Sequence, residues 1–405
     1  MNIRKGFSFL VLLLCVQGVW GQQLPNVLRY VENSMPLGLD PITGAGTAIG
    51  VRLIDLLFDG MVTYNEYGDP VKSLADTIIF SGSWVIVRLK PGLKWHDGHP
   101  ITPSDVRYSY NAFIHPKSPY SNKDRFSVIE RIEANDKEVR IKFVPGLDDT
   151  TMMAMLDFEL LPRHRVQAPT VRAGSPFSRN PIGCGPYKLD KVEENKICMT
   201  AHRPYHAGGP HIDGVEMYVQ PNDAIHSYMV STGEVDLDPV VRPQDVTLPH
   251  KNIRLEPYDS HSWSGIAFNC TNKFLRFEKV RVALTMAFDR ESALRSFYAG
   301  MGKVISGPFP VSSFAYDHTI LPWPNDRMKA KKLLEEMGFV DSDGDNVLER
   351  EGEDFELNMV LKGSLPDADK NVCADFQRQL ELIGVKVKIN YIAVSYTHLT
   401  LPTKA

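Results

Sequence analysis

Histidines are concentrated in two short stretches of the chain, and imidazole is a common ligand for transition metals. The first stretch, Trp-His-Asp-Gly-His, holds His96 and His99. Because two ligands without a third bind a metal weakly, we expect a turn with two exposed histidines. The second stretch holds His202, His206 and His211. We expect these three to be solvated, and the sequence predicts no metal site and no cofactor.

Alternating acids later in the chain resemble a calcium-binding loop. Asp341, Asp343 and Asp345 hold its first, third and fifth positions. The sixth position of such a loop is glycine and the twelfth is glutamate, but here they are Asn346 and Gly352. An acidic turn is therefore expected, with calcium binding as the less favoured alternative.

Patterns typical of hydrolases are absent from the sequence. It has no Gly-x-Ser-x-Gly, no His-Glu-x-x-His and no cysteine–histidine signature. The run Gly183-Cys184-Gly185 lacks a following Lys-Ser or Lys-Thr and precedes a predicted strand, which excludes a phosphate-binding loop. We therefore predict that the protein is not an enzyme. A secreted hydrolase is the alternative from another functional class.

The first 21 residues have the features of a secretory signal peptide. Arg4 and Lys5 precede an apolar run, and small residues favour cleavage near Gly21. The run is too short for a membrane span. Lipoprotein anchoring through Cys15 is disfavoured because Leu14 is large where a small residue is needed. We expect export to the periplasm.

Cysteine spacing leaves the redox state of the exported protein open. The four cysteines after the signal peptide allow three connectivities, so buried free thiols and a single disulfide are both compatible with the sequence. No Cys-x-x-Cys spacing is present, so metal binding through sulfur is not expected. The four are Cys184, Cys198, Cys270 and Cys373.

The last twelve residues, 394–405, continue no predicted element. They begin Val-Ser-Tyr-Thr-His-Leu, which resembles the translation of a sequencing adapter. We predict that this tail is a read-through artefact and that the natural protein continues past Ile392. A genuine disordered tail is the alternative. A chain that ends at Ile392 is expected to be unstable and unable to bind ligand, because an interrupted domain exposes apolar faces and sheet edges.

Composition and charge are those of an ordinary globular protein. The chain is 43% hydrophobic and 23% charged, and 405 residues suffice for two or three domains. Removing both ends takes away Arg4, Lys5 and Lys404 and no acid, so 42 of the 45 basic residues face 49 acidic ones. This mild acidity argues against nucleic acid or an anionic membrane as the partner.

Periodicity and turn residues predict an alternation of strands and helices. Thr102, Pro103 and Asp105 form a predicted capping box at the start of a helix. Strands are expected at 27–32, 85–90, 187–192, 355–361 and 385–392, with two more within 129–143 and one beginning at 235. Helices are expected at 49–58, 103–113, 223–232, 325–337 and 369–383, the fourth capped by Asn325.

Residues 263–269 alternate in a way that predicts a further strand. Ile266 and Phe268 would face a core. The other face has little bulk beside Trp263, so another backbone can approach it closely. A helix over 280–288 and a second helix over 290–298 follow, the second capped by Asp289 and ended by Gly300.

These motifs together resemble the family 5 extracellular solute-binding proteins, the oligopeptide and dipeptide receptors of ABC importers. The resemblance covers about residues 26–392. One departure is Cys184, where the family has threonine. The matching motifs are the turn Trp95-His96-Asp97-Gly98, the return Asn180-Pro181-Ile182-Gly183-Cys184-Gly185-Pro186-Tyr187, Gly233-Glu234-Val235-Asp236, and the crossover from Phe268-Asn269 to Asp289-Arg290.

The resemblance implies a two-lobed α/β periplasmic-binding-protein (Venus-flytrap) fold with an extra α+β subdomain in the first lobe. The first lobe would comprise 22–62 and 175–267, the inserted subdomain 63–174, and an incomplete second lobe 268–393. The chain would cross between the lobes near residue 268.

The function implied by the resemblance is capture of oligo- or dipeptides between the lobes and delivery to the permease subunits of an ABC transporter by a monomeric receptor. Relatives of the same fold carry nickel, haem or oligosaccharides, and these remain alternatives. The aspartate that pairs with a peptide's ammonium in this family would lie beyond Ile392. The residues expected to contact ligand are Ser34, Met35, Pro36, Tyr120, Ser262, Trp263, Gly265 and Ala267.

Overall fold

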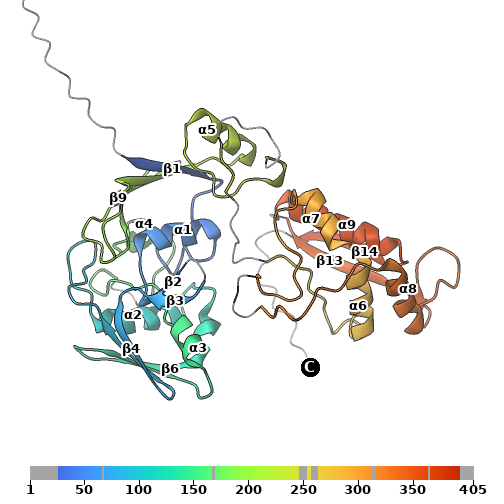
Figure 1. Ribbon diagram of the computed structural model, residues 1–405, viewed down its shortest axis with the longest axis horizontal. Coiled ribbons are helices and arrows are strands. Elements are labelled where there is room, and N and C mark those ends of the chain that lie inside the picture. The colour runs from blue at the N-terminus through green and yellow to red at the C-terminus, as the bar shows by residue number, and fades with distance from the viewer. Residues whose placement is uncertain are drawn as a thin grey trace, which may run out of the picture.

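The helices and strands of the computed structural model form two bodies (Figure 1). The first body holds β1–β10 and α1–α5, and the second holds α6–α9 and β11–β14. Within the part of the chain that the structure describes, no helix is long and apolar enough to cross a bilayer. The predicted signal peptide and the tail at 394–405 lie outside this part. The structure describes residues 26–65, 68–166, 169–245, 253–256, 263–311, 313, 316–363 and 365–392.

A mixed four-stranded sheet carries the first core of the first body. Its strand order is β1-β10-β9-β8, and β1 runs parallel to β10. Helix α1 packs on this sheet through Leu53, Ile54 and Leu57, and its start is capped by the hydroxyl of Thr47. Strands β1 and β8 and helix α1 were expected at these positions, whereas β9 and β10 were not predicted. The bounds are β1 Val27–Glu32, α1 Ala48–Leu57, β8 Tyr187–Val192, β9 Lys196–Ala201 and β10 Gly214–Val219.

A second, antiparallel sheet in the order β4-β5-β7-β6 carries a larger core. Helix α2 lies against it. The Asp105 carboxylate accepts hydrogen bonds from both the backbone nitrogen and the hydroxyl of Thr102, each at 2.8 Å, as predicted for the start of α2. The bounds are β4 Ala75–Ser81, β5 Trp84–Leu89, α2 Pro103–Ile114, β6 Ile129–Ala134 and β7 Val139–Phe143.

Shorter elements complete the first body. The helix expected at 223–232 is a 3-10 turn followed by α5, which ends at the left-handed Gly233. The strand expected from residue 235 makes only one bridge, Tyr30 to Leu237, beside β1. The bounds are β2 Val62–Tyr64, β3 Pro70–Lys72, α3 Asp149–Ala154, α4 Pro176–Arg179 and α5 His226–Thr232, with 3-10 turns at Lys123–Val128, Asp223–Ile225 and Pro243–Asp245.

The second body has its own core, formed by four helices and a parallel strand pair. Strands β13 and β14 are joined by α9, the predicted strand–helix–strand unit. Asp289 caps α7 as expected, but Asp326 caps α8, while the side chain of Asn325 donates to the carbonyl of Met286. The bounds are α6 Glu278–Ala287, α7 Arg290–Phe297, α8 Arg327–Glu336, β11 Glu349–Arg350, β12 Glu353–Asp354, β13 Glu356–Lys362, α9 Asp367–Glu381 and β14 Lys386–Ile392.

The strand expected at 263–269 is not formed. These residues belong to no ladder within the described ranges, although Ile266 and Phe268 do pack against the second core, as their alternation predicts. A strand needs a partner for its backbone groups as well as an apolar face. The alternation supplies only the face.

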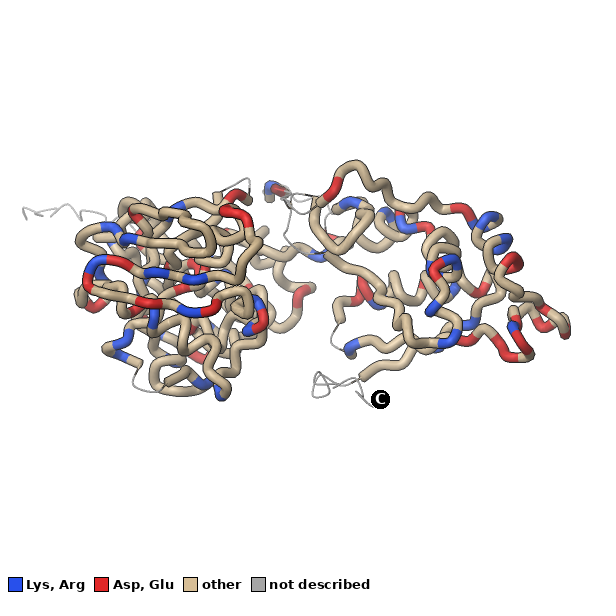
Figure 2. The backbone as a smooth tube through the Cα atoms, turned by 90° about the horizontal axis from the view of Figure 1, so that it is seen from below, with Lys and Arg blue, Asp and Glu red and all other residues tan. Residues whose placement is uncertain are grey.

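The larger core crosses the predicted limits of the inserted subdomain. Ile42, Met61 and Cys184, which lie outside 63–174, are buried in the same cluster as the second sheet. The domain limits therefore stay a prediction. Lysines, arginines, aspartates and glutamates are interspersed over both bodies in the view of Figure 2, in keeping with the absence of a basic patch in the sequence.

The glycine-rich return before β8 packs directly on the end of α1. A Cβ on Gly183 would lie 1.8 Å from the carbonyl oxygen of Leu57, and a Cβ on Gly185 would lie 2.6 Å from that of Leu56. The nitrogen of Gly185 donates to the Leu57 carbonyl at 3.0 Å. Neither glycine has a positive φ, so the close approach of two backbones, and not the backbone conformation, requires them.

We predict that Gly183→Ala lowers the free energy of unfolding by at least about 1–3 kcal/mol, because the added methyl forces two backbones apart. The matched control is Gly46→Ala, since Gly46 has no atom within 4 Å of a built Cβ and no positive φ. We expect the control to change stability by no more than about 0.5 kcal/mol. Denaturant unfolding of both variants measures the difference, and equal losses would contradict the close contact.

Candidate ligand-binding site

The loop after β1 holds the first group of predicted ligand contacts. Ser34 is exposed, and Met35 and Pro36 are half-buried. The loop leaves the sheet at Glu32, whose buried carboxylate accepts two hydrogen bonds from Arg52 of α1 at 2.7 and 2.8 Å. This ion pair fixes the end of β1, so the loop starts from a rigid point.

The segment 263–269 holds the second group, and Trp263, Gly265 and Ala267 are all exposed there. The indole of Trp263 lies over Gly265, because a Cβ at that glycine would meet the ring at 2.7 Å. The open space expected above Gly265 is thus occupied by this chain's own indole. Ser262 lies outside the described residues.

Tyr120, the third predicted contact, is half-buried at the edge of an aromatic cluster. Its ring centroid lies 4.7 Å from that of Phe113 and 6.1 Å from that of Phe126. Burial raises the pKa of its phenol, and a hydrogen bond with Arg125 acts in the opposite direction. Arg125 also pairs with the carboxylate of Asp157, so the hydroxyl of Tyr120 is held by a charged network.

Carboxyl groups gather near Tyr120 in a way that sequence reasoning missed. Burial raises the pKa of Glu159 to about 7, and repulsion from Asp157 and Asp55 adds to this shift. The side chains of Asp55, Asp157 and Glu159 thus lie together with that of Arg125. No sequence signal could have found it, because Asp55 lies about a hundred residues from the other two acids and no spacing connects them.

The prediction that His96 is an exposed turn residue is wrong. Its Nδ1 accepts from the nitrogen of Gly183 at 3.2 Å, and its Nε2 lies 3.0 Å from the carbonyl oxygen of Gly185. Burial lowers the pKa of the imidazole to about 4. His96 thus ties the Trp-His-Asp-Gly turn to the glycine-rich return, a contact across 87 positions that local spacing cannot reveal.

Two of the three clustered histidines are also not solvated, contrary to expectation. His202 is 7% exposed, its ring centroid is 4.9 Å from that of His96, and burial lowers its pKa. His206 Nε2 lies 2.9 Å from a carboxylate oxygen of Asp59. His211 is exposed, as expected.

The acidic turn after α8 forms as predicted. Asp341 accepts from the nitrogens of Gly344 and Asn346, and Asn346 adopts the left-handed conformation with a φ of 70°. Glu349 lies with the three aspartates of the turn, their oxygens within 4.8 Å of one another. Asx hydrogen bonds within the turn stabilise it.

The cysteines of the described chain are all free thiols. Cys184, Cys198 and Cys373 are buried, and burial raises the pKa of each thiol. Cys270 is exposed. Free buried thiols were one of the two states left open by the sequence.

Two cavities of the first body, formed by described residues, lie away from the candidate residues. One of about 600 Å³ lies beside the β4–β5 turn and includes Phe80, Ser83 and Leu147, and one of about 170 Å³ includes Cys184 and His202. Neither is lined by any of the eight candidate residues. That these candidates form one site therefore stays a prediction.

We predict that His96 makes stability pH-dependent. A histidine in an unfolded chain has a pKa of about 6.5, and the folded value is lowered to about 4, so the unfolded state binds more protons between these values. The stability contributed by neutral His96 is complete above about pH 6.5 and is lost as the pH falls toward 4, by about 2–3 kcal/mol.

The variant His96→Gln tests this because glutamine does not titrate. The difference in unfolding free energy between the natural protein and the variant should shrink by about 2–3 kcal/mol from pH 7.5 to pH 4. Denaturant titrations at several pH values measure it. A difference that stays constant over this range would show that His96 is not buried in its neutral form.

Comparison with known proteins relates the fold to a family. Residues 74–401 match the family described as "Bacterial extracellular solute-binding proteins, family 5 Middle". The oligopeptide-binding protein AppA of Bacillus subtilis (strain 168) is 26% identical over 359 residues, which are 84% of this chain and 64% of AppA. The dipeptide-binding protein of Escherichia coli (strain K12) is 25% identical over 365 residues, 83% of this chain and 68% of that protein. The chain thus spans about two thirds of the length of these relatives.

Solved structures share the fold. AppA from Bacillus subtilis in complex with a nonapeptide has a TM-score of 0.74 at 24% identity, covering 91% of this chain and 75% of that one. NikZ from Campylobacter jejuni in complex with Ni(L-His) has a TM-score of 0.76 at 23% identity, covering 91% and 74%. The mannohexaose-bound oligopeptide-binding protein of Thermotoga maritima has a TM-score of 0.72 at 19% identity, covering 92% and 73%.

These matches confirm the predicted fold class, a two-lobed α/β binding protein. The family match includes part of the tail at 394–405, so the artefact interpretation of that tail stays a prediction. The match covers most of the chain, as the motifs at Trp95, Asn180, Gly233 and Phe268 predicted. The chain belongs to the bacterial extracellular solute-binding proteins, family 5.

Proposed function

We propose that the protein is the substrate-binding component of an ABC importer that captures oligo- or dipeptides and delivers them to the permease subunits. The observation that carries this proposal is membership of family 5 together with relatives named for oligopeptide and dipeptide binding. The protein would act as a monomer in the periplasm, after cleavage near Gly21, and would perform no catalysis.

The proposed binding mode uses main-chain groups of the segment 263–269. No ladder occupies this segment among the described residues, so we expect its main chain to pair with an extended peptide. Its apolar face is anchored by Ile266 and Phe268 on the second core. On the other face the exposed indole of Trp263 lies over Gly265, so the indole itself would contact the ligand there. Side chains of the peptide would then lie in wet pockets, which gives low sequence specificity.

The remaining candidates would complete the site from the first lobe. Ser34, Met35 and Pro36 follow a strand end fixed by the pair of Glu32 and Arg52, and Tyr120 is held by Arg125. Closure of the two lobes, whose residue limits are those predicted from the sequence, would bury the ligand between them. The permease would recognise the closed form.

A different ligand on the same fold is the second candidate function. NikZ in complex with Ni(L-His) and a mannohexaose-bound relative favour a nickel chelate or an oligosaccharide, and haem is the further alternative. A secreted hydrolase is disfavoured because the sequence lacks its signatures.

We predict that the complete product of the gene binds a nonapeptide or a dipeptide and does not bind Ni(L-His), haem or mannohexaose. Calorimetric titration of the mature protein with each compound measures this. Mass spectrometry should recover the peptide intact, since a receptor leaves its ligand unchanged. Binding of the nickel chelate, haem or sugar with no binding of peptides would replace this proposal by the second candidate, and cleaved peptide would favour the hydrolase.

We predict that Trp263→Ala weakens peptide binding by about tenfold, because an exposed aromatic at a site supplies contact area at low entropic cost. The control is Trp84→Ala, which removes a partly exposed indole from the start of β5. Equal affinities of the two variants for the peptide would show that Trp263 does not contact it.

A further inference from the structure

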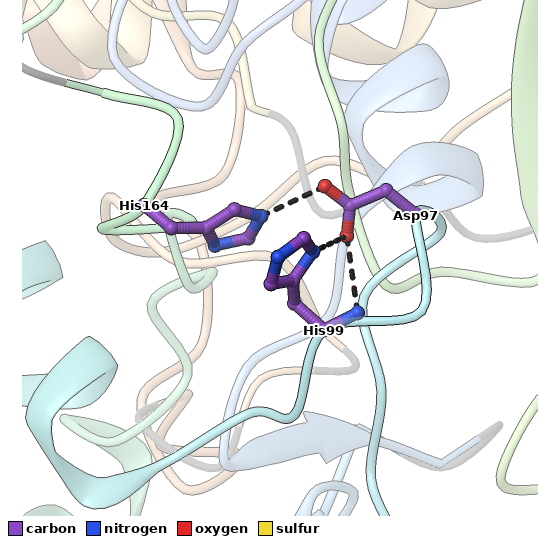
Figure 3. Close-up of side chains that lie close together, drawn as sticks. All are labelled: Asp97, His99 and His164. Carbon is purple, nitrogen blue, oxygen red and sulfur yellow. Dashed lines mark hydrogen bonds and ion pairs between the residues drawn. The ribbon is translucent and has the colours of Figure 1, made fainter.

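Two histidines from separate turns converge on one aspartate at the surface of the first body (Figure 3). The Nε2 atom of His164 lies 2.8 Å from one carboxylate oxygen of Asp97, and the Nδ1 atom of His99 lies 3.2 Å from the other. The two imidazole rings stack with centroids 4.2 Å apart. The ligating atoms of all three side chains lie within 4.8 Å of one another.

The turn that carries Asp97 and His99 is well defined. The nitrogen of Trp95 donates to the carbonyl of His99 at 2.9 Å, and that of Gly98 donates to the carbonyl of Trp95 at 2.9 Å. Gly98 has a φ of 89°, which a residue with a side chain rarely adopts. The backbone nitrogen of His99 also donates to Asp97, so both side chains leave the turn on one side.

The turn that carries His164 is fixed by two buried side chains of helix α2. The nitrogen of Leu161 donates to the hydroxyl of Ser109 at 2.7 Å, and the nitrogen of Arg163 donates to the Asp105 carboxylate at 3.2 Å. Both acceptors are at most 5% exposed. The same aspartate that caps α2 therefore sets the position of His164.

We propose that Asp97, His99 and His164 bind a divalent transition-metal ion of the zinc, nickel and copper class. Two imidazoles and one carboxylate match the ligand preference of these ions, whereas calcium and magnesium prefer oxygen ligands alone. Two ligands held 2.0–2.1 Å from a tetrahedral ion lie about 3.3 Å apart. Each imidazole nitrogen lies 2.8 or 3.2 Å from its own oxygen of Asp97, and the three ligand atoms lie within 4.8 Å of one another, so small side-chain shifts would admit an ion. Water would complete the coordination.

The third ligand comes from a part of the chain that the motif does not contain. His99 lacks a metal partner in His96, since both ring nitrogens of His96 interact with the glycine-rich return. His164, which is 67 positions from Asp97 and has no motif around it, supplies the missing imidazole. The objection that two ligands bind poorly therefore does not apply to this cluster.

Metal binding at this cluster has an identifiable cost. Each imidazole must offer a lone pair in place of the N–H that it can donate to Asp97, which a neutral ring achieves by moving its proton to the other nitrogen. Arg163 and Arg165 flank His164 in the sequence and disfavour a cation, although solvent screens exposed charges. We therefore expect moderate affinity, with a dissociation constant on the order of 1 μM.

The test is calorimetric titration of Zn²⁺ into the complete mature protein, purified without a histidine tag and freed of metal with a chelator. We expect one ion per chain. His99→Ala and His164→Ala should each weaken binding at least about tenfold to a hundredfold, the cost of losing even a supporting partner of a metal ligand. Asp97→Asn, which keeps the shape of the side chain but removes its charge, should weaken binding in the same range.

The matched control is His318→Ala. His318 is exposed and follows Asp317 in the second body, so it offers an imidazole beside a carboxylate without the convergent arrangement. We expect this variant to bind Zn²⁺ as the natural protein does. All the histidines exchanged are exposed, so circular dichroism should show the same fold and thermal transition for every variant without metal.

Tryptophan fluorescence gives a second measurement. Trp95 is fully buried, with its ring centroid 6.5 Å from that of His164, and Cu²⁺ or Ni²⁺ bound at the cluster should quench it. Quenching that survives His164→Ala, or Zn²⁺ binding that is unchanged in both histidine variants, would overturn the proposal. Equal weakening by His318→Ala would show adventitious binding to surface histidines. Peptide binding does not enter the test, so it is independent of the proposed function.

Discussion

The first body depends on one close contact between two stretches of backbone. The end of α1 and the glycine-rich return touch so closely that no Cβ fits at Gly183 or Gly185. The ring of His96 contacts the same return, with its Nδ1 at the nitrogen of Gly183 and its Nε2 at the carbonyl oxygen of Gly185. The end of α1, the glycine-rich return and the turn that carries His96 therefore meet at one place. This contact also places Cys184 in the core of the second sheet, which links the two sheets into one body.

The local parts of the fold could be predicted from the sequence because their causes are local. The capping box of Thr102 and Asp105 in α2 and the cap of α7 by Asp289 follow from residues three positions apart. The strands β5 to β7 follow from alternation. The predicted succession of strand, helix and strand at 355–392 is that of a crossover unit, and β13 and β14 are indeed parallel. In each case the residues that predict the element are the residues that form it, or lie directly beside them in the sequence.

The failures have a common cause, since they concern partners that lie far away in sequence. Residues 263–269 have the alternation of a strand but pair with no other strand among the described residues. His96 and His202 are expected in solvent from their neighbours in sequence, whereas segments far away in the chain bury them. For the candidate ligand site the sequence supplied the residue types and the family motifs. Their surroundings, such as the acids near Tyr120 and the indole over Gly265, required three-dimensional structure.

The distribution of thiols has a practical consequence for labelling the protein. Cys184, Cys198 and Cys373 are buried, and their raised pKa values keep them protonated and slow to react. Cys270 is exposed and directly follows 263–269, the stretch where the chain is predicted to cross between the lobes. Among the described cysteines, a maleimide dye should therefore react selectively with Cys270, and its emission would report changes around the predicted crossover.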